Sequence, residues 1–150
     1  MPEITGRPRI AFLALLTAMT TGCGGGTVSD ADPDAAAIEV VSLNEVAENY
    51  RGLSIFKKAP PKSVKEFTSN EMLMGAGTTA VRDGQIIVQW GSKLPDTNEE
   101  PGKVPSPEIL AYYKEVPESG GYVLLLDRTV KKMTADEFKA ASKAGNPSTK

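Results

Sequence analysis

Three stretches in the C-terminal half of the chain are rich in apolar residues and are joined by very short connections. Connections of two to five residues join antiparallel neighbours in a sheet. A fourth stretch, QIIVQW at residues 85–90, has the alternation of a half-buried strand. The sequence therefore predicts a roughly four-stranded antiparallel meander. Its other strands are EILAYYKEVP, GYVLLLD and TVKKM, joined by PESGG and by Asp127 with Arg128.

The first helix is expected over residues 42–52. Ser42 and Glu45 have the spacing of a capping box, and Gly52 can end the helix in a left-handed conformation. Between these signals, apolar residues recur at the i, i+3, i+4, i+7 spacing of a buried stripe. The members of this stripe are Leu43, Val46, Ala47 and Tyr50.

Two further helices are expected before the meander. Ser63 and Glu66 repeat the capping-box spacing and predict a short second helix. The segment NEMLMGAGTTAVRDG, residues 70–84, fits a third helix that ends at Gly84, although Asp83 and Gly84 would also suit a tight hairpin turn.

The meander is followed by a last predicted helix. Thr134 and Glu137 form a third capping-box pattern, Phe138 and Ala141 are expected to face inward, and Gly145 is the expected stop. N-terminal helices, an antiparallel meander and a C-terminal helix together predict an α+β domain.

The N-terminus has the pattern of an export signal. Arg7 and Arg9 precede the apolar run IAFLALLTAM, residues 10–19. This run is too short to cross a hydrocarbon core of about 30 Å as a helix, so a cleaved signal peptide over residues 1–22 is favoured over a transmembrane anchor. The protein is therefore expected to be exported.

The lone cysteine of the chain, Cys23, follows Thr20, Thr21 and Gly22. This order resembles the lipobox of bacterial lipoproteins, in which the cysteine sulfur receives a diacylglycerol and becomes the new N-terminus. The resemblance implies lipidation at Cys23 and a membrane anchor facing the periplasm or the cell exterior. Thr20 departs from the family, which has leucine or a similar aliphatic residue there. The alternative is an ordinary secretory signal with an incidental cysteine.

The rest of the chain divides into a tether, one domain and a tail. The segment GGGTVSDADPDAAA has almost no apolar side chains, so residues 23–37 are expected to form the lipidated cysteine and a flexible tether. A single small α+β domain is expected over residues 38–145, followed by a disordered tail over residues 146–150.

The segment YYKEVPESGGYVLLLDRTVKKMTADEF, residues 112–138, resembles the closing segment of bacterial prepilin-type processing-associated proteins. In that family a Gly-Gly pair leads a strand into an Asp-Gly turn. Small exported lipoproteins with a similar ending are mostly of unknown function. Here Arg128 stands where the turn favours glycine, because a positive φ is needed. The family's histidine is also absent, since Thr129 follows Arg128 and the chain has no histidine. The resemblance implies a shared hairpin and not a shared pilus role.

The residue inventory excludes most catalytic designs. The chain has no histidine, and its one cysteine is assigned to the anchor. Ser-His-Asp triads, Cys-His pairs and thiolate or imidazole metal sites are therefore excluded, and no cofactor or metal is predicted.

Two short motifs match catalytic or binding patterns only in part. The segment Gly75–Ala80, GAGTTA, has the spacing of a dinucleotide-binding loop but lacks the preceding strand and the long following helix, so a helix or loop is favoured. Ser119 is not a nucleophile elbow, because Pro117 stands where the first glycine belongs.

Carboxylates and aromatic residues are the remaining candidates. Asp127, Asp136 and Glu137 could form an acid and base pair or a calcium site. Structural roles are favoured instead, with Asp127 as a turn former, Glu137 as a cap partner and Asp136 in the first turn of a helix. Four aromatic residues on or beside the strands could contact a partner if they face outward, whereas core packing is the other interpretation. They are Trp90, Tyr112, Tyr113 and Tyr122.

Two function classes follow. The first is a non-enzymatic, lipid-anchored cell-envelope protein that binds or assembles with an unknown envelope protein or glycan. The second is a small envelope enzyme that uses carboxylate, serine or lysine chemistry. A deep pocket with ionisable groups would favour the enzyme, and an exposed aromatic patch would favour binding. No nucleic-acid partner is expected, because aromatic residues are not interleaved with the basic ones.

Overall fold

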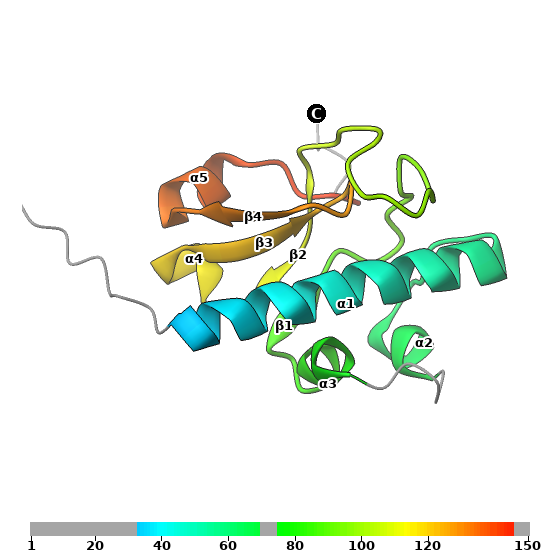
Figure 1. Cartoon of the computed structure of the whole chain (residues 1–150), viewed down its shortest axis with the longest axis horizontal. Coiled ribbons are helices and arrows are strands. Elements are labelled where there is room, and N and C mark those ends of the chain that lie inside the picture. Colours follow the sequence, from blue (N-terminus) through cyan, green and yellow to red (C-terminus); the bar gives the residue numbers. More distant parts are fainter. Residues whose placement is uncertain (1–32, 70–74, 146–150) are drawn as a thin grey trace, which may run out of the picture. The chain divides into compact units, whose positions relative to one another are not determined.

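A four-stranded antiparallel sheet forms the centre of the domain, with the strand order β1-β2-β3-β4 (Figure 1). The register pairs Ile87 with Tyr112, Tyr112 with Val123, and Val123 with Lys131. The predicted meander is confirmed. The strands are β1 Ile86–Val88, β2 Ile109–Tyr113, β3 Gly121–Leu125 and β4 Val130–Met133.

The computed structural model describes residues 33–69 and 75–145 of the chain. The predicted signal peptide, Cys23 and the predicted tail lie outside these residues. The α+β class is confirmed, with helices before the sheet and one after it. The helices of the described part are α1 Pro33–Lys57, α2 Val64–Thr68, α3 Ala76–Arg82, α4 Val116–Ser119 and α5 Ala135–Ala140.

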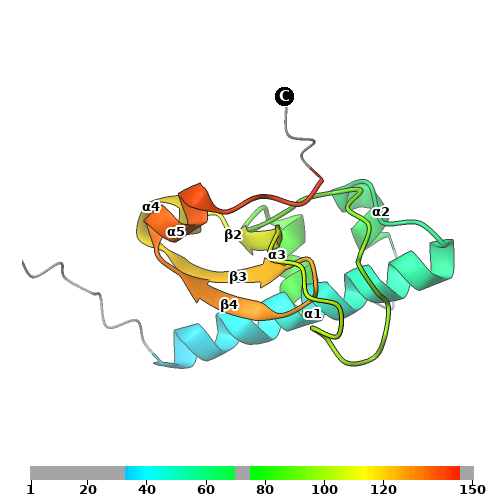
Figure 2. The same ribbon diagram turned by 90° about the horizontal axis from the view of Figure 1, so that it is seen from above.

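Helices cover both faces of the sheet. Figures 1 and 2 show α1 and α5 on opposite sides of β3 and β4. On the α1 side, the first three helices pack against residues of the strands, including Ile86, Ala111 and Leu124. On the α5 side, Phe138 and Val116 pack against Val123 and Met133. The alternation along each strand therefore supplies two separate cores.

The first helix is longer than the sequence predicted at both ends. It begins at Pro33, so residues 33–37 of the expected tether are helical, and it continues past Gly52 to Lys57. Proline suits the first helical position, and the alanines after it favour a helix. Gly52 does not end α1, because the buried stripe continues to Leu53. The helix ends where Lys58 adopts φ 54°.

The other helix predictions are confirmed in their main features. Ser63 caps α2, since its side chain accepts a hydrogen bond from the Glu66 amide. Residues 70–84, for which the sequence allowed either a helix or a tight hairpin turn, form helix α3 in their described part. Residues 70–74 lie outside the described part. Gly84, at φ 70°, follows α3 and donates to the Val81 carbonyl, while Gln85 donates to Ala80. This is the hydrogen-bond pattern of a Schellman motif.

One connection and one helix end differ from the prediction. The predicted strand EILAYYKEVP ends at Tyr113, and the short helix α4 replaces a simple hairpin turn between β2 and β3. Helix α5 ends at Ala140 and not near Gly145, because Ala141 is already extended, with ψ 142°. The backbone beyond it instead pairs with β2: Ile109 donates to the Ser142 carbonyl, and Ala144 donates to the Ile109 carbonyl.

The turn between β3 and β4 is a three-residue loop, one residue longer than the predicted connection of Asp127 and Arg128. Leu125 accepts from the Arg128 amide and donates to the Thr129 carbonyl, so the loop residues are 126–128. Arg128 adopts φ 70°. The positive φ that the sequence predicted for the residue after Asp127 is therefore confirmed, although this residue is an arginine and not a glycine.

Candidate functional site

The four candidate aromatic side chains do not gather into one patch. Trp90 packs against Phe67, with ring centroids 5.6 Å apart, and Tyr112 packs edge-on against Phe138 at 4.7 Å on the α5 side of the sheet. Tyr113 and Tyr122 are half-buried beside the core on the α1 side. Their packing leaves only parts of the rings available to a partner.

Tyr50, which was not among the predicted site residues, is the most deeply buried of the described tyrosines. Tyr50 of α1 is fully buried, and its hydroxyl donates to the Ser92 carbonyl at 2.8 Å. Burial raises the pKa of Tyr50 to about 12. This hydrogen bond joins α1 to the loop between β1 and β2. The sequence placed Tyr50 in the apolar stripe of the first helix but gave no sign of the hydrogen bond.

The glycines of the GAGTTA segment allow close helix packing. A Cβ added to Gly77 would lie 2.3 Å from the Ser42 carbonyl oxygen, so α3 can approach α1 only because this residue has no side chain. The Glu45 carboxylate accepts from the Gly77 amide at 2.7 Å. The first turn of α3 therefore bonds to a side chain of α1, which accounts for the motif without a nucleotide.

The carboxylates singled out in the sequence have structural partners. Asp127 accepts from the Ser106 amide at 3.2 Å and from the Thr129 hydroxyl at 2.6 Å. Glu137 and Thr134 complete the predicted capping box, and the Thr134 backbone hydrogen bond holds the pKa of Glu137 below its usual range. Asp136 is exposed in the first turn of α5. No group of three potential metal ligands occurs among the described residues.

Arg128 is the centre of a polar cluster that the sequence did not predict. Its side chain is 1% exposed. One guanidinium nitrogen lies 3.0 Å from a Glu48 oxygen of α1, and the other lies 3.3 Å from Asp96. The latter nitrogen also donates to the carbonyls of Asn98 and Glu100. The long loop between β1 and β2 is thereby fastened to α1 and to the β3–β4 turn.

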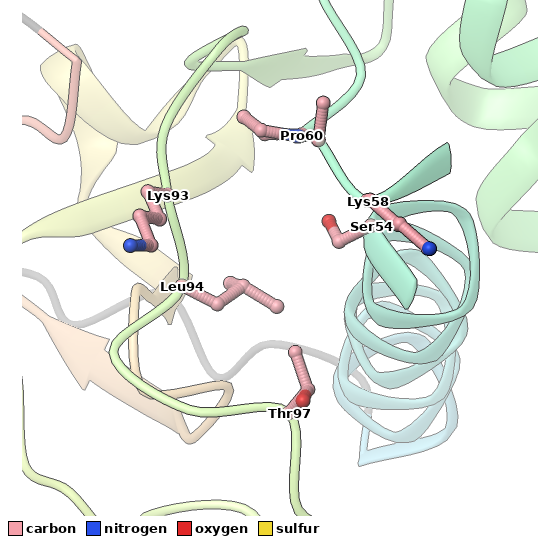
Figure 3. Close-up of a pocket in the computed structure, with 7 residues that line it drawn as sticks. Ser54, Lys58, Pro60, Lys93, Leu94 and Thr97 are labelled. Atoms are coloured by element: carbon pink, nitrogen blue, oxygen red, sulfur yellow. The ribbon is translucent and has the colours of Figure 1, made fainter. Parts of the chain in front are cut away.

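A pocket of about 330 Å³ lies between this long loop and the C-terminal end of α1 (Figure 3). Leu94 and the Ser54 hydroxyl point into the space, whereas the ammonium groups of Lys58 and Lys93 point away from it. No carboxylate lines the pocket, so its walls offer no pair for acid and base catalysis. The lining residues are Ser54, Lys58, Ala59, Pro60, Lys93, Leu94 and Thr97.

The comparisons with known proteins do not place the chain in a family. No family model, no curated protein and no solved structure matches it. The resemblances to lipoproteins and to prepilin-type processing-associated proteins stay predictions from the sequence. Among the described helices, none is long and apolar enough to cross a membrane.

Proposed function

We propose that this chain is a lipid-anchored cell-envelope protein whose α+β domain is a non-catalytic binding or assembly module. The observation that carries the proposal is Cys23, the lone cysteine, placed directly after a short apolar run and the residues Thr-Thr-Gly. A single thiol in an exported chain has no disulfide partner within that chain, whereas acylation gives it a role.

The arrangement of the described domain supports a binding role over a catalytic one. Asp127 and Glu137 are held in turn and cap hydrogen bonds, and the pocket beside α1 is lined without a carboxylate. In contrast, apolar side chains are exposed on α1: Ile38 is 62% exposed and Val41 is 54% exposed. These two residues lie one turn apart, so they present one small apolar surface for an envelope protein or glycan.

The anchor is tested by mass spectrometry of the mature N-terminus, together with membrane fractionation, for the wild type and for Cys23→Ser. We expect a diacylated Cys23 in the membrane fraction of the wild type and loss of both properties in the variant. An unmodified N-terminus at another residue, with soluble protein in both cases, would contradict the proposal.

The binding role is tested separately with a photo-crosslinking amino acid at position 41 in cells, and at the exposed position of Asp136 as the matched control. A discrete crosslinked species is expected at position 41, and Ile38→Asp should weaken it. Equal crosslinking at both positions would argue against a binding surface on this part of α1.

A further inference from the structure

The C-terminal end of α1 and the segment after it form the most basic region of the chain. Residues 51–65 contain five basic residues and no acidic one, although the whole chain has a net charge of −2. The preceding part of α1 has the opposite charge, because residues 36–50 contain three glutamates and no basic residue. The basic residues are Arg51, Lys57, Lys58, Lys62 and Lys65.

Large apolar side chains are exposed among these lysines. Phe56 is 84% exposed, the highest value among the exposed large apolar residues of the described part. Ile55 beside it is 50% exposed, and Val64 at the start of α2 is 39% exposed. We name this surface the basic tip, formed by Ile55, Phe56, Lys57, Lys58, Lys62, Val64 and Lys65.

Part of the positive charge of the basic tip has no described counter-ion. Lys57 pairs with Glu66 at 2.8 Å, which joins α1 to α2. Lys58, Lys62 and Lys65 form no ion pair with another described residue, and all three are exposed. The tip is also held firmly, because Leu53 and Phe67 beneath it are buried in the core.

We propose that the basic tip docks on an anionic lipid surface. Exposed lysines attract anionic headgroups, and a protruding aromatic or aliphatic side chain can enter the boundary between headgroups and acyl chains. A protruding Phe56 among lysines requires no complementary groove in its partner, and a fluid bilayer supplies both the charge and the apolar layer. An acidic protein would supply the charge but would need a cavity for the ring.

This inference rests on the proposed lipid anchor only because the anchor would place the domain beside a membrane. The lengths of the chain after Cys23 and of α1 are compatible with that anchor. Ten residue steps separate Cys23 from Pro33, and an extended chain of that length spans at most about 35 Å. The helix from Pro33 to Phe56 is also about 35 Å long. The anchor and the basic tip can therefore reach the same bilayer if α1 lies along its surface.

The test uses the full chain with Cys23→Ser, so that acylation does not dominate binding. Co-sedimentation is measured with vesicles of phosphatidylcholine alone and with about one third phosphatidylglycerol. Residues 1–22 are common to all variants, so differences between variants report on the domain. We expect stronger partitioning onto the anionic vesicles and a loss of that preference at high salt.

Two variants target the basic tip, and one matched variant serves as the control. Replacing Lys58, Lys62 and Lys65 with glutamate is expected to weaken partitioning at least about hundredfold, since each lysine contributes about fivefold. Phe56→Ser is expected to weaken it about tenfold. The control replaces three exposed lysines elsewhere, Lys114, Lys131 and Lys139, with glutamate and should weaken it far less.

Circular dichroism verifies that each variant is folded. Equal binding to neutral and anionic vesicles, or an equal loss in the control triple variant, would overturn the proposal. In the first case the tip would be available to an acidic protein instead. Failure of the anchor would appear in the mass of the N-terminus and not in this assay, so the two proposals fail independently.

Discussion

Arg128 has a backbone conformation that glycine adopts more easily, and its surroundings explain why an arginine is there. A non-glycine residue at φ 70° is disfavoured by about 1 kcal/mol. The buried guanidinium offsets this by binding Glu48, Asp96 and two loop carbonyls at once. Only arginine carries enough donors in one plane for all of these acceptors. The residue thus joins a turn, a helix and a loop.

Replacing Arg128 separates these two effects. Arg128→Ala should lower the free energy of unfolding by about 3 kcal/mol, because Asp96 and the loop carbonyls lose their partner. Arg128→Gly loses the same contacts but relieves the backbone, so it should be less destabilised by about 1 kcal/mol. Chemical denaturation of both variants measures the difference. Equal stability of the two variants would mean that the positive φ carries no strain.

Tyr50 makes stability depend on pH in the alkaline range. Burial raises its pKa from the usual 10.0 to about 12, so the folded state keeps the phenol proton to higher pH than the unfolded state. Its contribution is present in full below pH 10 and is lost as the pH rises through about 12.

Tyr50→Phe should therefore flatten the fall in unfolding free energy above pH 10. At neutral pH it should be less stable than the wild type by about 1 kcal/mol, because the Ser92 carbonyl loses its donor. Thermal unfolding at a series of pH values measures both effects. An unchanged alkaline slope in Tyr50→Phe would show that the burial of this phenol does not set the dependence of stability on pH.

Among the elements, α1 and α3 show how two glycines in helices can have opposite roles. Gly77 lies where α3 meets α1, and a Cβ there would lie 2.3 Å from the Ser42 carbonyl oxygen. Gly52 lies on the outer face of α1, with nothing within 4 Å of the added Cβ. One position needs glycine for packing, and the other has it without a packing reason.

Alanine substitutions at these positions should change stability in opposite directions. Gly77→Ala is expected to destabilise the domain by about 2 kcal/mol, because α3 must move away from α1. Gly52→Ala is expected to stabilise it by about 0.5–1 kcal/mol, because alanine favours the helix interior. Denaturation midpoints measure both changes. If Gly52→Ala were destabilising, residue 52 would be a helix end in solution.

The sequence predicted the local elements well and their lengths poorly. The sheet, the caps at Ser63 and Thr134 and the stop at Gly84 were all visible, because each depends on residues close in sequence. The extension of α1 past Gly52 depends on contacts of Leu53 with distant elements. The pairing of Ile109 with the segment after α5 depends on the tertiary fold in the same way.

The candidate sites were less predictable for the same reason. Turn chemistry indicated a positive φ at residue 128, but the carboxylates around Arg128 come from α1 and the long loop. The four lysines of the basic tip lie within residues 57–65 of the sequence, but the exposure of Phe56 beside them depends on how α1 packs in the fold. A helix ending at Gly52 would have placed this residue in a loop.

For the whole molecule, the shared core predicts a single unfolding transition. Trp90, the lone tryptophan, packs on Phe67, and Phe67 belongs to the same core as α1 and the sheet. Its fluorescence should therefore change at the same denaturant concentration as the far-ultraviolet circular dichroism. Two separate midpoints would show that the region around Trp90 unfolds independently of the sheet.

The position of Ala144 limits when the core can be completed during synthesis. This residue is fully buried in the core beside α1, and its amide bonds to Ile109 at the start of β2. The ribosome synthesises residue 144 after every described strand and helix of the domain. The nascent chain therefore lacks one piece of its interior until synthesis has passed that point, so the core can close only after residue 144 has been made. Such a delay fits the export proposed for this chain, in which a polypeptide crosses a membrane before it folds.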